Sequence, residues 1–213
     1  MNETEINNNL IERFKPVDRA NHWLTAITFI LAALSGLALF HPAFFWLTNF
    51  FGGGTWTRIL HPFIGVVLAI SFGLLAKRFH ADNRITDADR EWVRRFRDVV
   101  ANRDQNLPEV GRYNAGQKLL FWVMVTTIAL LLVSGIVIWQ PWFAPWFSIG
   151  LTRVAVLIHA LAAFVLTAGV IVHIYAVIWI KGTLRGMTRG TVTRTWAKHH
   201  HPGWYREVSK GTK

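Results

Sequence analysis

The sequence predicts an all-α fold: an integral membrane protein with a bundle of four transmembrane helices. Hydrophobic residues make up 52% of the 213 residues and charged residues only 16%, whereas about a quarter of a soluble domain is charged. Eleven Trp residues suit helices that end at membrane–water interfaces. Two long stretches, from Arg19 to Lys77 and from Lys118 to Lys181, each contain a single charged residue between those ends.

Turn-forming residues interrupt each of these stretches once, at 41–54 and at 140–150. Four apolar segments remain, at about 22–40, 59–78, 115–139 and 153–180. A span needs about 20 apolar residues at about 1.5 Å rise per residue, so each segment is long enough to cross a bilayer. In lipid each must be a helix, because its backbone groups have to be hydrogen-bonded within the segment. We expect a single membrane domain over residues 1–213.

Positive charge orients the spans. All Lys and Arg residues except Arg58 and Arg153 lie in the N-terminal tail, in the region 77–118, or in the tail 181–213, and all 12 acidic residues lie there too. The positive-inside rule therefore predicts a multi-pass protein with both termini and the 80–113 connection in the cytoplasm. Topology explains the net charge of +11, so we expect lipid and not nucleic acid as the partner of the basic residues.

The cytoplasmic connection contains a predicted helix. Thr86 and Asp89 have the spacing of a capping box. Apolar residues then recur at helical spacing beside arginines, which is typical of a basic amphipathic helix on the inner membrane surface. A partner-binding helix is nearly as plausible. The residues are Trp92, Phe96, Val99, Val100, Arg90, Arg94 and Arg97. The tail from Lys181 reads as a basic extension, and we find no internal repeat.

Cysteine is absent, which excludes disulfides, thiolate zinc sites, cysteine-ligated iron–sulfur clusters and covalent haem attachment through CxxCH. A redox cofactor would have to be held by nitrogen, oxygen or thioether ligands. Nine His residues are present. Those at 199–201 form a cluster in the tail, for which a solvated or partner-facing run is a better interpretation than a metal site.

Two histidines lie well inside the fourth span. His159 and His173 are separated by just under four helical turns, so they face the same side about 21 Å apart along the axis. A lone buried histidine is more often a hydrogen-bonded structural residue. A same-face pair at opposite depths favours haem ligation, with one b-type haem at each leaflet.

Each of the two requires a partner at its own depth. At the inner level His22 and His80 compete for His173, and His80 follows two basic residues among the headgroups, which favours His22.

At the outer level His61 and His41 compete for His159. His61 opens an apolar run and His41 closes one before a proline, which favours His61 weakly. Arg58 and Arg153 lie on this otherwise uncharged side, where they either pair with propionates of the outer haem or fix helix ends to headgroups.

The sequence also resembles a known family over about residues 13–210. It is similar to the cytochrome b (gamma) subunit of membrane-bound formate dehydrogenase. The stretches that carry the resemblance are RANHW (19–23), RILHPFIG (58–65), GRYNAGQK (111–118), WIKGTLRGM (179–187) and WAKHHHPGWYRE (196–207).

The resemblance implies specific site residues. It implies two haem b groups, the inner one held by histidines matching His22 and His173 and the outer one by those matching His61 and His159. It also implies a quinone site at the cytoplasmic side, formed by Asn114 with His173, for either menaquinone or ubiquinone. We add Gln117, one turn further along the same helix face. By its position alone Asn114 would be a helix N-cap.

For function, the resemblance implies a di-haem cytochrome b in the bacterial inner membrane. It would carry electrons from a periplasmic iron–sulfur (beta) subunit and a molybdenum or tungsten catalytic (alpha) subunit to quinone near the cytoplasmic face, generating a proton-motive force. A higher oligomer of this heterotrimer is compatible with the sequence. One alternative is the cytochrome b of a nickel–iron hydrogenase or thiosulfate reductase. Another is a haem-free anchor or a proton conductor with histidine relays. The absence of Asp and Glu within the spans disfavours a proton relay.

Overall fold

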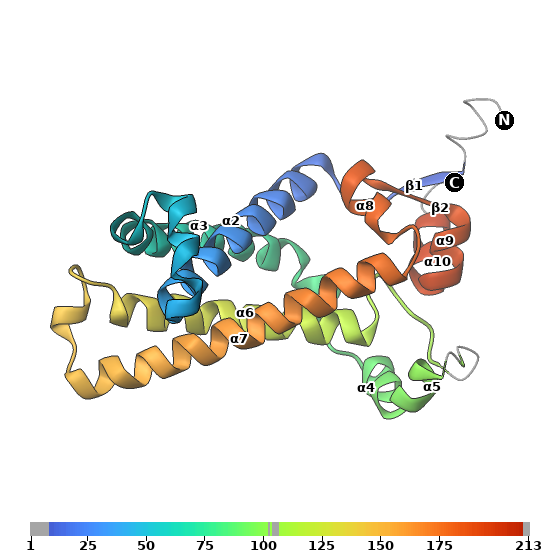
Figure 1. Ribbon diagram of the computed structural model, residues 1–213. Coiled ribbons are helices and arrows are strands. Elements are labelled where there is room, and N and C mark those ends of the chain that lie inside the picture. Colours follow the sequence, from blue (N-terminus) through green and yellow to red (C-terminus); the bar gives the residue numbers. More distant parts are fainter. Residues whose placement is uncertain (1–8, 102, 104–106, 211–213) are drawn as a thin grey trace. The chain divides into compact units, whose positions relative to one another are not determined.

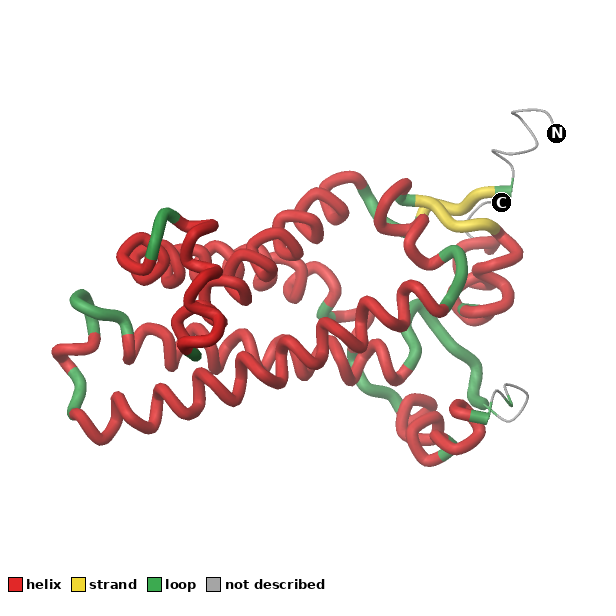
Figure 2. The backbone as a smooth tube through the Cα atoms, in the orientation of Figure 1, coloured by secondary structure: helices red, strands yellow, loops and turns green. Residues whose placement is uncertain are grey.

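The computed structural model describes residues 9–101, 103 and 107–210, and most of these residues are helical (Figure 2). Four helices are long and apolar enough to cross a membrane, which confirms the four predicted spans. They are α2 (Pro16–Phe40), α3 (Gly54–Phe79), α6 (Ala115–Ile138) and α7 (Ile149–Trp179). The shorter elements are β1 (Leu10–Glu12), η1 (Pro42–Phe51), η2 (Ala81–Asn83), α4 (Asp87–Arg94), α5 (Phe96–Val100), η4 (Ala144–Trp146), α8 (Thr183–Arg189), β2 (Thr191–Thr193), α9 (Arg194–His200) and α10 (Pro202–Lys210).

Three of the long helices begin four to six residues earlier than predicted, because capping groups and not charges mark their starts. The fourth span is an example: the Oγ of Ser148 accepts a hydrogen bond from the backbone N–H of Leu151 (3.3 Å), so α7 begins before Arg153. Likewise α2 begins at Pro16, a residue favoured in a first turn, with Asp18 near the positive end of the helix dipole.

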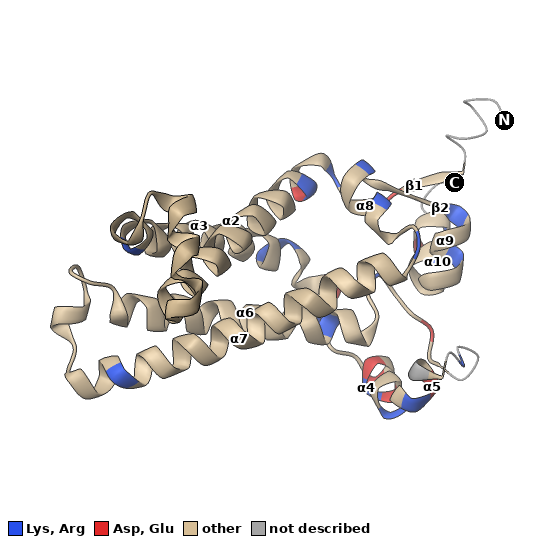
Figure 3. Ribbon diagram, viewed as in Figure 1, with Lys and Arg blue, Asp and Glu red and all other residues tan. Residues whose placement is uncertain are grey.

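The contacts divide the chain into two compact units. The apolar unit comprises residues 20–77 and 123–172, and the polar unit comprises the described parts of 1–19, 78–122 and 173–213. Figure 3 shows charged residues on α4, α5, α9 and α10 of the polar unit, while α6 and α7 have long stretches without charge. The prediction of a single domain stays a prediction.

In the apolar unit, polar side chains join α2 to α3. The Nδ2 of Asn21 donates to the carbonyl of Ser71 (3.0 Å), and the Oγ1 of Thr25 lies 3.1 Å from the Oγ of Ser71. The ring of Phe63 on α3 packs edge-on against Trp139 at the end of α6, with centroids 5.2 Å apart. The predicted break at 41–54 is the 3-10 helix η1, which ends at Gly52 in the left-handed conformation (φ 84°).

In the polar unit, a two-stranded antiparallel sheet joins the two ends of the chain (Figure 1). Leu10 of β1 lies opposite Thr193 of β2. Ile11 and Val192 are buried with Trp204 from α10, so the sheet and the last helices share a small core. The tail is therefore folded and is not the simple extension expected from its composition.

The predicted capping box at Thr86 and Asp89 is confirmed at the start of α4. The helix that follows is interrupted at Arg95, so the amphipathic segment forms two short helices, α4 and α5. Asp89 pairs with Lys118 at the start of α6 (2.7 Å). Burial would raise the pKa of Asp89, but hydrogen bonds from Lys118 and Thr86 outweigh burial and hold it below the ordinary value. The location of α4 and α5 on the membrane surface stays a prediction.

Candidate functional site

The apolar unit brings together two of the predicted ligands. His61 on α3 and His159 on α7 have ring centroids 6.3 Å apart, with the ring planes at 73°. Both side chains are half-buried. The sequence only weakly favours His61 over His41, and the structure gives His41 a different role, because its Nδ1 accepts the backbone N–H of Ala43 (3.2 Å) and caps η1.

Each of these two imidazoles is held by a serine through the same ring nitrogen. The Nδ1 of His61 lies 2.9 Å from the Oγ of Ser35 on α2. The Nδ1 of His159 lies 3.0 Å from the Oγ of Ser134 on α6. The other ring nitrogen, Nε2, therefore stays available for a metal on both sides.

A glycine follows each serine and gives the imidazole its space. A Cβ added at Gly36 would lie 3.1 Å from the Cε1 of His61, and a Cβ at Gly135 would lie 3.3 Å from the Cε1 of His159. Both distances are tighter than ordinary contacts, so a side chain at either position would push the ring away. The two glycines allow the rings to lie directly against α2 and α6.

The site fits a haem better than a free metal ion. Among the described residues there is no group of three or more His, Cys, Asp or Glu side chains able to hold a metal ion. Zinc would require three or four protein ligands, whereas haem iron requires only axial ones. Imidazole nitrogens lie about 2.0–2.1 Å from first-row metals such as zinc, and one metal held between two Nε2 atoms at such distances leaves the ring centroids about 6 Å apart. The separation of His61 and His159 agrees with this value.

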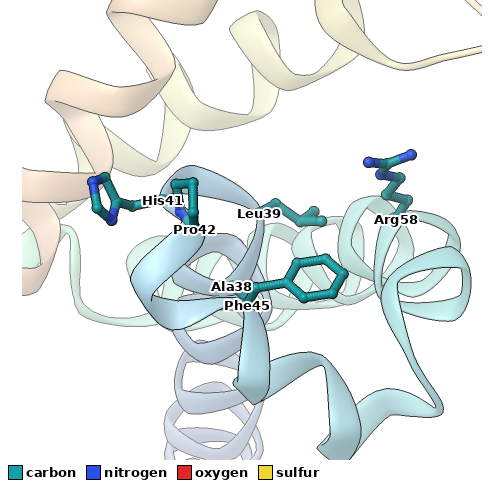
Figure 4. A pocket seen from close by; sticks show the side chains of 6 residues that line it. All are labelled: Ala38, Leu39, His41, Pro42, Phe45 and Arg58. Carbon is teal, nitrogen blue, oxygen red and sulfur yellow. The ribbon is translucent and has the colours of Figure 1, made fainter.

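The outer arginines lie in this unit as well. Arg58 and His41 stand at opposite ends of a cavity of about 500 Å³, with the apolar side chains of Leu39 and Phe45 between them (Figure 4). Arg58 and Arg153 are both exposed, and neither forms an ion pair with an acidic side chain in the part of the chain that the structure describes. Their pairing with haem propionates stays a prediction.

The inner histidines belong to different units. His22 lies on α2 in the apolar unit, with its ring edge-on to Trp23 at 5.5 Å. His173 lies on α7 in the polar unit. Both are half-buried. Their pairing as ligands of an inner haem stays a prediction.

Asn114 and Gln117 bind each other's backbone at the start of α6. The Oδ1 of Asn114 accepts the backbone N–H of Gln117 (2.9 Å), and the Oε1 of Gln117 accepts that of Asn114 (3.0 Å). This is a reciprocal capping box, so the N-cap interpretation of Asn114 is confirmed. The two capping bonds use the amide oxygens and not the amide NH₂ groups. A quinone contact at Asn114, Gln117 or His173 stays a prediction.

The prediction of a solvated or partner-facing run at 199–201 is wrong for His201, whereas His199 is exposed. The side chain of His201 is only 3% exposed, and its Nδ1 donates to the carbonyl of Gly111 (3.0 Å). The pKa of His201 is lowered to about 4. Burial of the imidazole is the main cause, and the positive charge of the nearby Arg13 is the second. Arg13 itself is 5% exposed and packs over the Trp204 ring (4.2 Å). His201 is a neutral structural residue that joins the tail to the loop before α6.

Sequence reasoning missed the serines that hold the outer pair. The signal is present in both helices as Thr, six residues, Ser, Gly: TFILAALSG ending at Gly36 and TIALLLVSG ending at Gly135. The two segments do not stand out as a repeat, because their other positions share little beyond being apolar. The common pattern pairs α2 and α3 with α6 and α7 around one site.

The chain matches a known protein family along most of its length. The family model for prokaryotic cytochrome b561 matches residues 13–190. The formate dehydrogenase cytochrome b556(fdo) subunit of Escherichia coli (strain K12) is 47% identical over 203 residues, which cover 95% of each chain. The nitrate-inducible cytochrome b556(Fdn) subunit of the same strain is 42% identical over 94% of this chain and 93% of its own. The formate dehydrogenase cytochrome b556 subunit of Haemophilus influenzae is 39% identical over 97% of this chain and 87% of its own. The chain belongs to the prokaryotic cytochrome b561 family of b-type haem proteins of the membrane.

Proposed function

We propose that this chain is the di-haem cytochrome b subunit of a membrane-bound, quinone-reducing formate dehydrogenase. The observation that carries the proposal is the facing pair His61 and His159, which has the separation that one iron between two imidazoles requires. The names of the three relatives, each similar along almost the whole chain, support formate dehydrogenase as the complex.

In this proposal four histidines hold the cofactors. His61 and His159 would hold the outer haem, and His22 and His173 would hold the inner haem. The haems, when bound, supply reversible one-electron chemistry inside the membrane. The protein's own contribution is to orient the imidazoles and to exclude water around them, which the apolar helices do.

The same proposal assigns quinone binding to the start of α6. Asn114, Gln117 and His173 all belong to the polar unit. The amide NH₂ groups of Asn114 and Gln117 are the donors suited to a quinone carbonyl, since their oxygens are used for capping. Protons for quinone reduction would enter from the cytoplasm.

The proposed setting follows from the charge distribution. Both termini and the 80–113 connection would lie in the cytoplasm, in the bacterial inner membrane. The outer end, with Arg58 and Arg153, would face a periplasmic iron–sulfur subunit and a molybdenum or tungsten catalytic subunit. Formate chemistry would belong to that partner, and uptake of protons inside with release outside would generate the proton-motive force.

The test is purification of the complex from membranes with a tag on this chain. We expect a large formate-oxidising subunit and an iron–sulfur subunit to co-purify, and a dithionite-reduced spectrum with a b-type α-band at two haems per chain. A hydrogenase or thiosulfate reductase large subunit would replace the formate assignment and leave the haem assignment intact. Absence of the α-band would reject the cytochrome function itself.

A further inference from the structure

We infer that Ser35 and Ser134 are positioning residues that set the tautomer of the two outer ligands and lower the reduction potential of the haem they hold. This inference rests on the proposed haem ligation by His61 and His159. It adds two residues to the site and assigns them an electronic effect. The evidence is the direction of four hydrogen bonds at two matched positions.

At the first position, the proton of Ser35 is already engaged. Its Oγ lies 2.7 Å from the carbonyl oxygen of Leu31, one turn earlier on α2. A carbonyl can only accept, so the serine hydroxyl donates to it. A hydroxyl has one proton, so in the 2.9 Å contact the Nδ1–H of His61 donates to the Oγ of Ser35, beside the Ala32 carbonyl that also accepts a hydrogen bond from this imidazole.

The second position repeats the first one. The Oγ of Ser134 donates to the carbonyl of Leu130 (2.6 Å), so its 3.0 Å contact with His159 is donated by the Nδ1–H of the imidazole. Both histidines thus carry their proton on Nδ1. Both present an unprotonated Nε2, the form in which imidazole binds a metal.

Burial increases the effect of these hydrogen bonds on the imidazoles. Ser35 is 0% exposed and Ser134 is 4% exposed, so water cannot take the place of either hydroxyl. In a chain from imidazole to hydroxyl to helix carbonyl, each bond polarises the next, and the effect is larger in an apolar interior. An acceptor on the Nδ1–H raises the basicity of the ligating nitrogen and orients the ring. A more basic ligand favours ferric over ferrous iron, which lowers the potential.

A purely structural role for the serines is the competing explanation, and the chain supplies matched controls for it. Thr28 and Thr127 occupy equivalent positions two turns earlier on α2 and α6 and are 7% and 6% exposed. Their hydroxyls donate to helix carbonyls one turn back, at 2.8 Å in both cases. Among the described residues, their hydrogen bonds go to backbone carbonyls alone. They share the burial and helix bonding of the serines without the histidine.

The experiment is a redox titration of the purified complex, with the outer haem followed at its α-band, for S35A, S134A, the double variant, T28A and T127A. We expect each serine variant to raise the ferrous-to-ferric ratio at a fixed potential severalfold and at most about tenfold, which is 59 mV for a one-electron couple. The double variant should show the product of the two changes. The threonine variants and the inner haem should not shift.

Two further measurements keep the test decisive. S35C and S134C keep nearly the original side-chain volume but offer a weak sulfur acceptor, so they should shift the potential in the same direction if an alanine variant fails to assemble. The low-spin ferric electron paramagnetic resonance signal of the outer haem should move in the serine variants, since it reports ligand basicity and ring orientation. An unchanged potential in serine variants with full haem content, or an equal shift in T28A and T127A, would overturn the inference. Failure of the proposed function is different: the wild-type complex would then lack the b-type α-band.

Discussion

His61 in the apolar unit and His201 in the polar unit are both hydrogen-bonded through Nδ1, but their second nitrogens meet different surroundings. His61 faces the imidazole of His159 across 6.3 Å. His201 lies against Trp196, with ring centroids 5.1 Å apart, and near the buried Arg13. The first environment suits a metal between two neutral ligands, whereas the second excludes a positive charge.

The partner of Nδ1 therefore does not by itself distinguish a ligand from a structural histidine. In both cases Nδ1 bonds an oxygen, from Ser35 at one site and from Gly111 at the other. The difference lies in what each ring has beside it, because the ring centroid of His61 is 6.3 Å from that of a second imidazole, His159. Substituting His61 and substituting His201 tests this difference. We expect the largest effect at His61, because it is a proposed haem ligand.

The first prediction compares His61→Ala with His201→Ala. Removing His61 leaves one axial imidazole, so we expect complete loss of the outer haem and a fall from two haems per chain to one. His201→Ala should keep both haems. The measurement is the pyridine haemochrome content of the purified complex. Retention of two haems in His61→Ala would show that the facing imidazoles are not the ligands.

The sequence predicts the helices of the spans better than it predicts the polar unit. Within the spans, lipid removes most alternatives, so hydropathy locates the helices. Depth then points to His159 and narrows its partner to His61 or His41, and the family resemblance selects His61. Ser35 and Ser134 escape notice, because a lone serine in a span usually bonds its own helix and its approach to a histidine depends on how helices pack.

The polar unit is less predictable for a different reason. Its sheet pairs Ile11 with Val192, residues from opposite ends of the sequence. Local composition contains no sign of this strand pairing. It therefore predicts a solvated or partner-facing run at 199–201, whereas His201 is buried. The helix starts are displaced from the predicted ones for a different, local reason. A capping residue such as Ser148 is a weaker signal in a sequence than a charged residue such as Arg153.

The second prediction concerns pH and the polar unit alone. The pKa of His201 lies at about 4, below the ordinary 6.5, because burial and Arg13 disfavour its charged form. Unfolded, this histidine takes up a proton near pH 6.5; folded, it does so only near pH 4. Its contribution is therefore complete above about pH 6.5 and is lost as pH falls toward 4, with a maximum of about 3 kcal/mol.

Hydrogen exchange measures this effect locally. Amides of α9 and α10 in the intact complex should lose protection between about pH 6.5 and pH 4.5, after correction for intrinsic exchange rates. His201→Asn is the control, since its Nδ2 occupies the position of the imidazole Nδ1 and can still donate to the Gly111 carbonyl but does not titrate. Parallel pH profiles in the wild type and the variant would assign the pH dependence to other groups.

The third prediction tests the space around His61 with two glycine variants. A Cβ at Gly36 would lie 3.1 Å from the Cε1 of His61, whereas Gly73 on α3 is exposed and a Cβ there would meet no atom within 4 Å among the described residues. Alanine is a better helix former than glycine, so Gly73→Ala should be neutral or slightly stabilising in a complex that keeps both haems. Gly36→Ala must displace the imidazole by a few tenths of an ångström, and overpacking of this kind costs about 1–3 kcal/mol.

That cost should appear in the haem and not only in the fold. A displaced ring weakens both its bond to Ser35 and its alignment with the iron, so Gly36→Ala should lower outer-haem retention during detergent washing and shift the thermal unfolding midpoint downward. Gly73→Ala supplies the baseline for adding a methyl group to a spanning helix. If both variants retain haem equally, then the close approach of Gly36 to His61 contributes nothing to the site. Only the neighbours of the two rings, His159 beside His61 and Trp196 beside His201, would then distinguish the proposed ligand from the structural histidine.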